Sequence, residues 1–163
     1  NHPNWLRYTM MDMVRAAQFH GIPFGIPRLD PIVQDTTTRK IAADQPYIKR
    51  ITRLGQAAAR RGNGVAFAHE AAQLIWGGAD NWHEGDHLAG AAERAGLDLA
   101  ELDAEIAAQP EDFDTQIAAN QQALEEAGHW GVPTLVFDGE PFFGQDRIDM
   151  VKWRMEQKGL EPR

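Results

Sequence analysis

The chain has 163 residues, of which 43% are hydrophobic and 25% charged, a composition typical of a folded globular protein with a core. Its formal net charge of −8 argues against nucleic acid or an anionic membrane surface as partner, because no basic excess exists to replace phosphate counterions. No apolar run approaches the roughly 20 residues of a membrane-spanning helix. The absence of cysteine excludes a disulfide, a thiolate nucleophile and a thiolate metal site within these residues.

The first 127 residues are predicted to be helical almost throughout. Hydrophobic periodicity and glycine stops predict helices at residues 4–20, 36–61, 65–76, 84–95, 98–108 and 111–127. Three prolines predict a loop or extended segment at 21–31, and Pro46 is expected to divide or kink the second helix. Asp98 stands in N-cap position with Glu101 three residues on, a capping-box-like spacing.

The pattern changes near the C-terminal end. Residues 134–137 and 140–143 are two short β-prone runs, joined by Asp138-Gly139, a strong hairpin turn. An amphipathic helix is predicted from Gln145 to about Gln157. A two-stranded hairpin is not stable alone in water, so we expect it to join strands that precede Asn1.

The segment GVPTLVFDGEPFFGQDRIDMV resembles the C-terminal signature of the 2-hydroxychromene-2-carboxylate isomerases and kappa-class glutathione transferases, within the DsbA-like thioredoxin family. AAQLIWGGADNWHEGDHLAGAAERAGLD is similar to the middle of the helical domain that this family inserts into its thioredoxin fold. The resemblance implies an α/β, thioredoxin-like fold that is mainly α in this chain. Residues 1–110 would form the helical insertion domain, and residues 111–163 the C-terminal half of the thioredoxin-like domain (helix, β-hairpin, helix).

The same resemblance implies a β-α-β unit before Asn1 that holds the nucleophile. That nucleophile is a serine in the isomerase and kappa types and a Cys-x-x-Cys in disulfide oxidoreductases. The catalytic residue is therefore unknown from these 163 residues.

The resemblance implies a cis peptide bond between Val132 and Pro133. Such a bond would turn the backbone N–H and C=O of Val132 outward, where glutathione could pair with them as an added strand. The alternative is a tight turn that enters a strand and binds no ligand.

Gly144-Gln-Asp-Arg147 opens the last predicted helix, where free N–H groups and the helix dipole favour a carboxylate. The resemblance implies that Gln145 and Asp146 bind the γ-glutamyl end of glutathione, Gln145 as an amide donor and Asp146 as acceptor for the ammonium group. The alternative is that Asp146 caps the helix while Arg147 is solvated or pairs with Asp149.

Three residues near the start of the chain are candidates for the pocket of a second substrate. Asn4, Trp5 and Tyr8 lie where the family's helical domain begins, and the resemblance places them across the cleft from the active site. The alternative is that these aromatic side chains are part of the core.

An acidic, histidine-containing cluster looks like a metal site at first: Asp80, His83, Glu84, Asp86 and His87. His83 and His87 have the i, i+4 spacing of helical zinc ligands. Gly85 interrupts that spacing and acidic residues are favoured at any helix start, so we predict no metal. His69 is expected to be a packed or surface residue, and His129, beside Trp130, is left without a role.

The function that the resemblance implies is a glutathione-dependent isomerase or transferase acting on an electrophilic aromatic acid. One alternative is a DsbA-like disulfide oxidoreductase with its Cys-x-x-Cys upstream, and a second is a non-catalytic helical binding module. The glutathione hypothesis also implies a cytoplasmic location, and the resemblance leaves a homodimer open.

Overall fold

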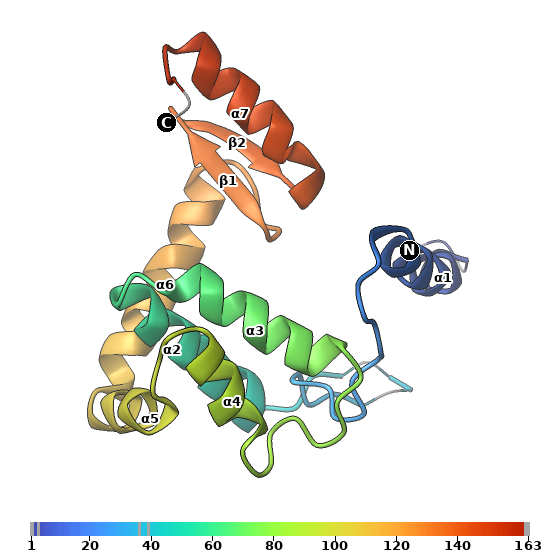
Figure 1. Ribbon diagram of the computed structural model, residues 1–163, viewed down its shortest axis with the longest axis vertical. Coiled ribbons are helices and arrows are strands. Elements are labelled where there is room, and N and C mark those ends of the chain that lie inside the picture. The colour runs from blue at the N-terminus through green and yellow to red at the C-terminus, as the bar shows by residue number, and fades with distance from the viewer. Residues whose placement is uncertain (1, 3, 36, 39, 162–163) are drawn as a thin grey trace. The chain divides into compact units, whose positions relative to one another are not determined.

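The computed structural model describes residues 2, 4–35, 37–38 and 40–161, and the chain divides into two compact units, Asn1–Phe113 and Asp114–Arg163. Within that range no helix is both long and apolar enough to cross a lipid bilayer. The elements in chain order (Figure 1) are α1 (Trp5–His20), α2 (Pro46–Arg60), α3 (Gly64–Trp76), α4 (His87–Arg94), α5 (Leu99–Ala108), α6 (Pro110–Glu126), β1 (Thr134–Phe137), β2 (Glu140–Phe143), the 3₁₀ turn η1 (Gln145–Arg147) and α7 (Ile148–Gln157).

The core of the first unit lies among α2, α3, α4 and α5, where α3 packs on α2 and α4, and α5 packs on the same two helices. Large and small side chains alternate there, because fully buried alanines let the helix backbones approach while leucine and phenylalanine fill the remaining space. The cluster consists of Leu54, Ala57, Ala58, Phe67, Ala71, Leu88, Ala92, Ala95, Leu102, Ile106 and Phe113.

The second helix is shorter than predicted. It begins at Pro46 in the first helical position, and the prediction of helix over residues 37–38 and 40–45 is wrong. Two further residues of the predicted helix, Thr36 at its start and Arg39, lie outside the described residues. The Asp35 carboxylate accepts hydrogen bonds from the backbone N–H of Thr37 at 2.9 Å and of Thr38 at 2.6 Å. These bonds hold the pKa of the Asp35 carboxyl below its usual value, and the bond from the Thr38 amide has the largest effect. They also form a turn that competes with helix.

The fourth helix also starts late, at His87 instead of residue 84. Gly85 adopts a left-handed φ of 57°, which interrupts a helix, and the residues before it form a loop. The loop is anchored by Trp82, which is 1% exposed and donates its indole N–H to the Leu29 carbonyl at 2.9 Å. His83 lies in this loop and His87 is the first residue of α4, so the two histidines do not share a helix.

Two sets of ion pairs join α2 to α5. Arg50 holds Asp103 with two bonds of 2.9 and 2.6 Å, a fork geometry that fixes the relative position of the helices, and the Asp103 carboxylate raises the pKa of Arg50. Arg61 and Arg60 pair with Glu105 and lower the pKa of that carboxyl.

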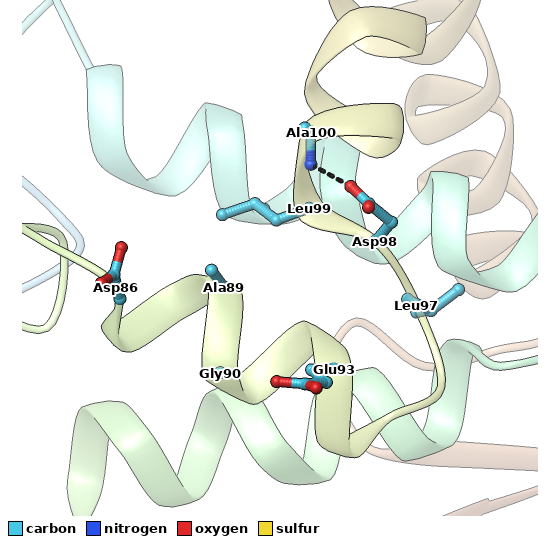
Figure 2. Close-up of a pocket in the computed structure, with 8 residues that line it drawn as sticks. All are labelled: Asp86, Ala89, Gly90, Glu93, Leu97, Asp98, Leu99 and Ala100. Atoms are coloured by element: carbon cyan, nitrogen blue, oxygen red, sulfur yellow. Dashed lines mark hydrogen bonds between the residues drawn. The ribbon is translucent and has the colours of Figure 1, made fainter.

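The N-cap of α5 is formed as predicted, since the Asp98 carboxylate accepts a hydrogen bond from the backbone N–H of Ala100 at 2.7 Å (Figure 2) and another from that of Glu101 at 3.1 Å. We expect Asp98→Ala to lower the free energy of unfolding by about 1 kcal/mol, the usual cost of a lost cap. Asp98→Asn keeps an acceptor and serves as the matched control. Urea unfolding measures both, and equal stabilities of the two variants would contradict the capping role.

The second unit contains the predicted hairpin. β1 pairs antiparallel with β2 in the register Thr134↔Phe143 to Phe137↔Glu140. Asp138 and Gly139 both have positive φ, 53° and 78°, as a type I′ turn requires. In Figure 1 α7 lies along the hairpin. The α7 residue Val151 and Phe142 of β2 are both buried, and α7 packs against β1, so burial of apolar side chains holds this unit together.

The ladder of the hairpin determines which backbone groups face outward. The amide of Gly144 donates to the carbonyl of Pro133 at 2.9 Å, so this pair is hydrogen-bonded. Pairs alternate along an antiparallel ladder, so Thr134 and Val136 turn their N–H and C=O groups away from β2. Pro141 stands opposite Val136, in a pair that forms no ladder hydrogen bonds. Its backbone nitrogen faces the outer edge of β2, so the lack of an N–H there costs the ladder no bond.

Candidate functional site

The backbone of Val132 is the feature of the second unit best suited to bind a ligand. The Val132–Pro133 bond is cis, the isomer that the resemblance implies. The Val132 side chain is 78% exposed, and across the described part of the chain no hydrogen bond engages its backbone N–H or C=O. A donor and an acceptor on one residue are thus free for an extended ligand.

The residue before Val132 is fixed at both of its polar groups. The Gly131 amide donates to Nδ1 of His129 at 2.9 Å, and the Thr134 hydroxyl donates to the Gly131 carbonyl at 2.6 Å. With the bond from Gly144 to Pro133, the neighbours of Val132 are held on both sides. These hydrogen bonds of His129 and Thr134 were not predicted from the sequence. The feature of the sequence that could have indicated these bonds is the position of the two residues, with His129 two residues before Gly131 and Thr134 three residues after it.

An aromatic stack supports this segment. The His129 ring stacks on Trp130, with centroids 4.6 Å apart, and on Phe143, with centroids 4.2 Å apart. A Cβ on Gly131 would lie 2.6 Å from Cε2 of Phe143, closer than atoms approach, so this position accepts only glycine without a shift of the rings. Trp130 itself is 83% exposed, which leaves an apolar surface beside Val132.

The second predicted binding segment lies next to the first, because the Gly144 amide bonds to Pro133. Gln145 starts the turn η1, and neither η1 nor α7 has a side-chain cap. Asp146 therefore does not cap the helix. Its carboxylate pairs with the Arg147 guanidinium at 3.1 Å, in place of the Arg147–Asp149 pair weighed as an alternative. Both side chains are largely exposed, so opposite charges stand side by side at this turn.

The three candidates for a second substrate pocket lie on α1. Asn4 is the N-cap residue of α1, but its side chain forms no capping hydrogen bond. Its backbone N–H donates to Nδ1 of His2 at 3.2 Å. Trp5 is 49% and Tyr8 56% exposed, so neither is a core residue. All three belong to the first unit, whereas Val132 belongs to the second.

The acidic, histidine-containing cluster is spread among separate contacts. Asp80 pairs with Arg28 at 2.9 Å, and the His83 ring packs edge-on against Tyr47 at 5.0 Å. Among the residues that the structure describes, no group of three or more His, Asp or Glu side chains is arranged to hold a metal ion. His69 is exposed on α3 and lies 2.9 Å from the Gln73 amide.

The pockets of the first unit differ in the character of their lining. One of about 550 Å³, shown in Figure 2, is lined by the carboxylates of Asp86, Glu93 and Asp98, which would repel an anionic ligand. Another, of about 340 Å³, lies between α2 and α3 and is lined mainly by apolar side chains such as Ile51 and Trp76.

Comparisons with known proteins identify the family and the fold of this chain. The family model for the DSBA-like thioredoxin domain matches residues 1–156. The solved structure of a selenomethionine-labelled 2-hydroxychromene-2-carboxylate isomerase superposes with a TM-score of 0.64 at 22% identity, covering 94% of this chain and 66% of the isomerase chain. This chain thus spans slightly less than two thirds of that protein. No curated protein sequence matches. The chain belongs to the family of DSBA-like thioredoxin domains.

Proposed function

We propose that the second unit binds glutathione along Val132 and that the protein acts as a glutathione-dependent isomerase or transferase of the 2-hydroxychromene-2-carboxylate isomerase or kappa type. The observation that carries the proposal is the free N–H and C=O of Val132 between neighbours that are fixed. A tripeptide that pairs with these groups breaks no existing bond, and it meets a backbone already in place.

Charge complementarity supports the same ligand. The γ-glutamyl end of glutathione carries an ammonium group beside a carboxylate. We assign the ammonium to the exposed Asp146 carboxylate and the carboxylate to the Gln145 side-chain amide at the adjacent turn position. The bond from Gly144 to Pro133 keeps this turn next to Val132, so both ends of the binding segment belong to one small structure.

The proposed chemistry depends on the bound cofactor. Glutathione would supply a thiolate that adds reversibly to a conjugated aromatic acid in an isomerase, or that stays attached to an electrophile in a transferase. By the resemblance, a serine hydroxyl outside these 163 residues would hold the thiolate. Asn4, Trp5 and Tyr8 are proposed to contact the electrophile, and the location is proposed to be cytoplasmic, where glutathione is abundant.

A disulfide oxidoreductase is the second candidate function. The family match supports it, and the exposed backbone of Val132 beside the exposed Trp130 ring also suits an extended polypeptide. The two functions differ in the ligand that Asp146 favours. A zwitterionic γ-glutamyl group needs this carboxylate, whereas a polypeptide main chain does not.

We expect reduced glutathione to bind saturably in isothermal titration, and Asp146→Asn to weaken binding by roughly 10- to 100-fold, the usual effect of losing a charge-assisted hydrogen bond. Asp149→Asn is the matched control, because it removes the same charge from an exposed position three residues away. The dipeptide Cys-Gly, which lacks the γ-glutamyl group, should bind both variants equally.

Absence of glutathione binding by the unmodified protein would refute the proposal and favour the disulfide oxidoreductase or a binding module. Equal weakening in Asp146→Asn and Asp149→Asn would mean that only net charge matters at this turn.

A further inference from the structure

We propose that His129 is a positioning residue of the glutathione site. It acts through Gly131, by accepting a hydrogen bond from the amide of the Trp130–Gly131 peptide and so fixing the residue that precedes Val132. The inference rests on the proposed function and adds to it a residue that touches neither glutathione nor the electrophile.

The hydrogen bond defines the state of the imidazole. Since the Gly131 amide is the donor, Nδ1 of His129 must be the acceptor, and the ring proton must be on Nε2. The stacking on Trp130 and Phe143 sets the plane of the ring and so aims Nδ1 at the amide. The ring is therefore held by packing, and the backbone is held by the ring.

Glycine at 131 makes this support necessary. The contact with Phe143 leaves no space for a Cβ, so residue 131 has to be the residue with the greatest backbone freedom. Two bonds remove that freedom, one through the amide to His129 and one through the carbonyl from Thr134. Without the first, the peptide joining Trp130 and Gly131 can rotate, and a ligand that pairs with Val132 must order it on binding.

The alternative is that His129 only fills space against Phe143. Two variants separate the roles. His129→Phe keeps an aromatic ring for stacking and removes the acceptor, whereas His129→Asn removes the ring and keeps an oxygen acceptor close to the position of Nδ1. Circular dichroism shows whether each variant remains folded.

Two measurements test the proposal: hydrogen exchange of the Gly131 amide by NMR without ligand, and glutathione affinity by isothermal titration. We expect His129→Phe to lose protection of this amide and to bind glutathione roughly 3- to 10-fold more weakly, the range of one net hydrogen bond. His129→Asn should retain the protection and recover most of the affinity.

A His129→Phe variant with unchanged amide protection and unchanged affinity would overturn the inference and assign the residue to packing. Weakening in both variants with the Gly131 amide still protected would overturn it as well. These outcomes are distinguishable from failure of the proposed function, in which the unmodified protein binds no glutathione while its Gly131 amide is protected.

Discussion

Replacing Phe113 by alanine is expected to lower the free energy of unfolding of the first unit by about 3–5 kcal/mol, the range for truncating a fully buried aromatic side chain. Phe113 is 0% exposed and is the buried residue of α6. The Arg60 guanidinium lies over its ring, 4.0 Å from the centroid, and the same guanidinium pairs with Glu105. The truncation would leave a cavity and also remove the surface on which this cation rests.

The control for this variant is Val65→Ala on α3, where the side chain is 87% exposed and the expected change is within about 0.5 kcal/mol. Equilibrium unfolding in urea, followed by tryptophan fluorescence, measures both. A loss below about 1 kcal/mol for Phe113→Ala would mean that α6 does not contribute to the core of this unit.

Gly131→Ala is expected to damage the second unit and its site together. The new methyl group would lie 2.6 Å from Phe143 and 3.0 Å from His129, so the rings or the backbone must move. We expect a loss of about 1–3 kcal/mol, as for other overpacked positions, and a loss of glutathione affinity of at least roughly tenfold because Val132 moves with its neighbour.

The matched control is Gly55→Ala within α2, where a Cβ meets no atom within 4 Å. This helical position should gain about 0.4–1 kcal/mol, because alanine restricts the unfolded chain and favours helix. The same substitution would then have opposite signs at two sites. Destabilisation of similar size at both positions would show that the close contact at Gly131 is not what limits the residue there.

Elements defined by short-range chemistry could be predicted from the sequence. The Asp138-Gly139 turn needs positive φ at two successive residues, and the Asp98 cap needs one acceptor beside free amides. Both requirements are met within four residues of chain. Residues 37–38 and 40–45 were mispredicted for a related reason, since apolar spacing indicated helix while the Asp35 carboxylate made a better local bond to the backbone N–H of Thr38.

The candidate site was predictable only in part. The sequence of Gly131-Val-Pro-Thr and its resemblance indicated where a ligand would pair. The hydrogen bond from Gly131 to His129 could not be predicted from the sequence. It depends on which ring nitrogen of His129 faces the Gly131 amide, and on the stacking with Phe143 that sets the plane of the ring. The Asp146–Arg147 pair was likewise missed, since both Asp146 and Asp149 are plausible partners by spacing alone.

Pro141 makes the two long sides of the hairpin chemically unequal. Along the outer edge of β2, Pro141 has no N–H to donate, so a strand of another chain cannot form a continuous ladder of hydrogen bonds there. On the side of β1, Thr134 and Val136 offer a complete row. Another strand can therefore pair with the hairpin along β1 but not along β2. Fibril growth needs strand pairing at both edges, so Pro141 opposes edge-to-edge aggregation of the hairpin.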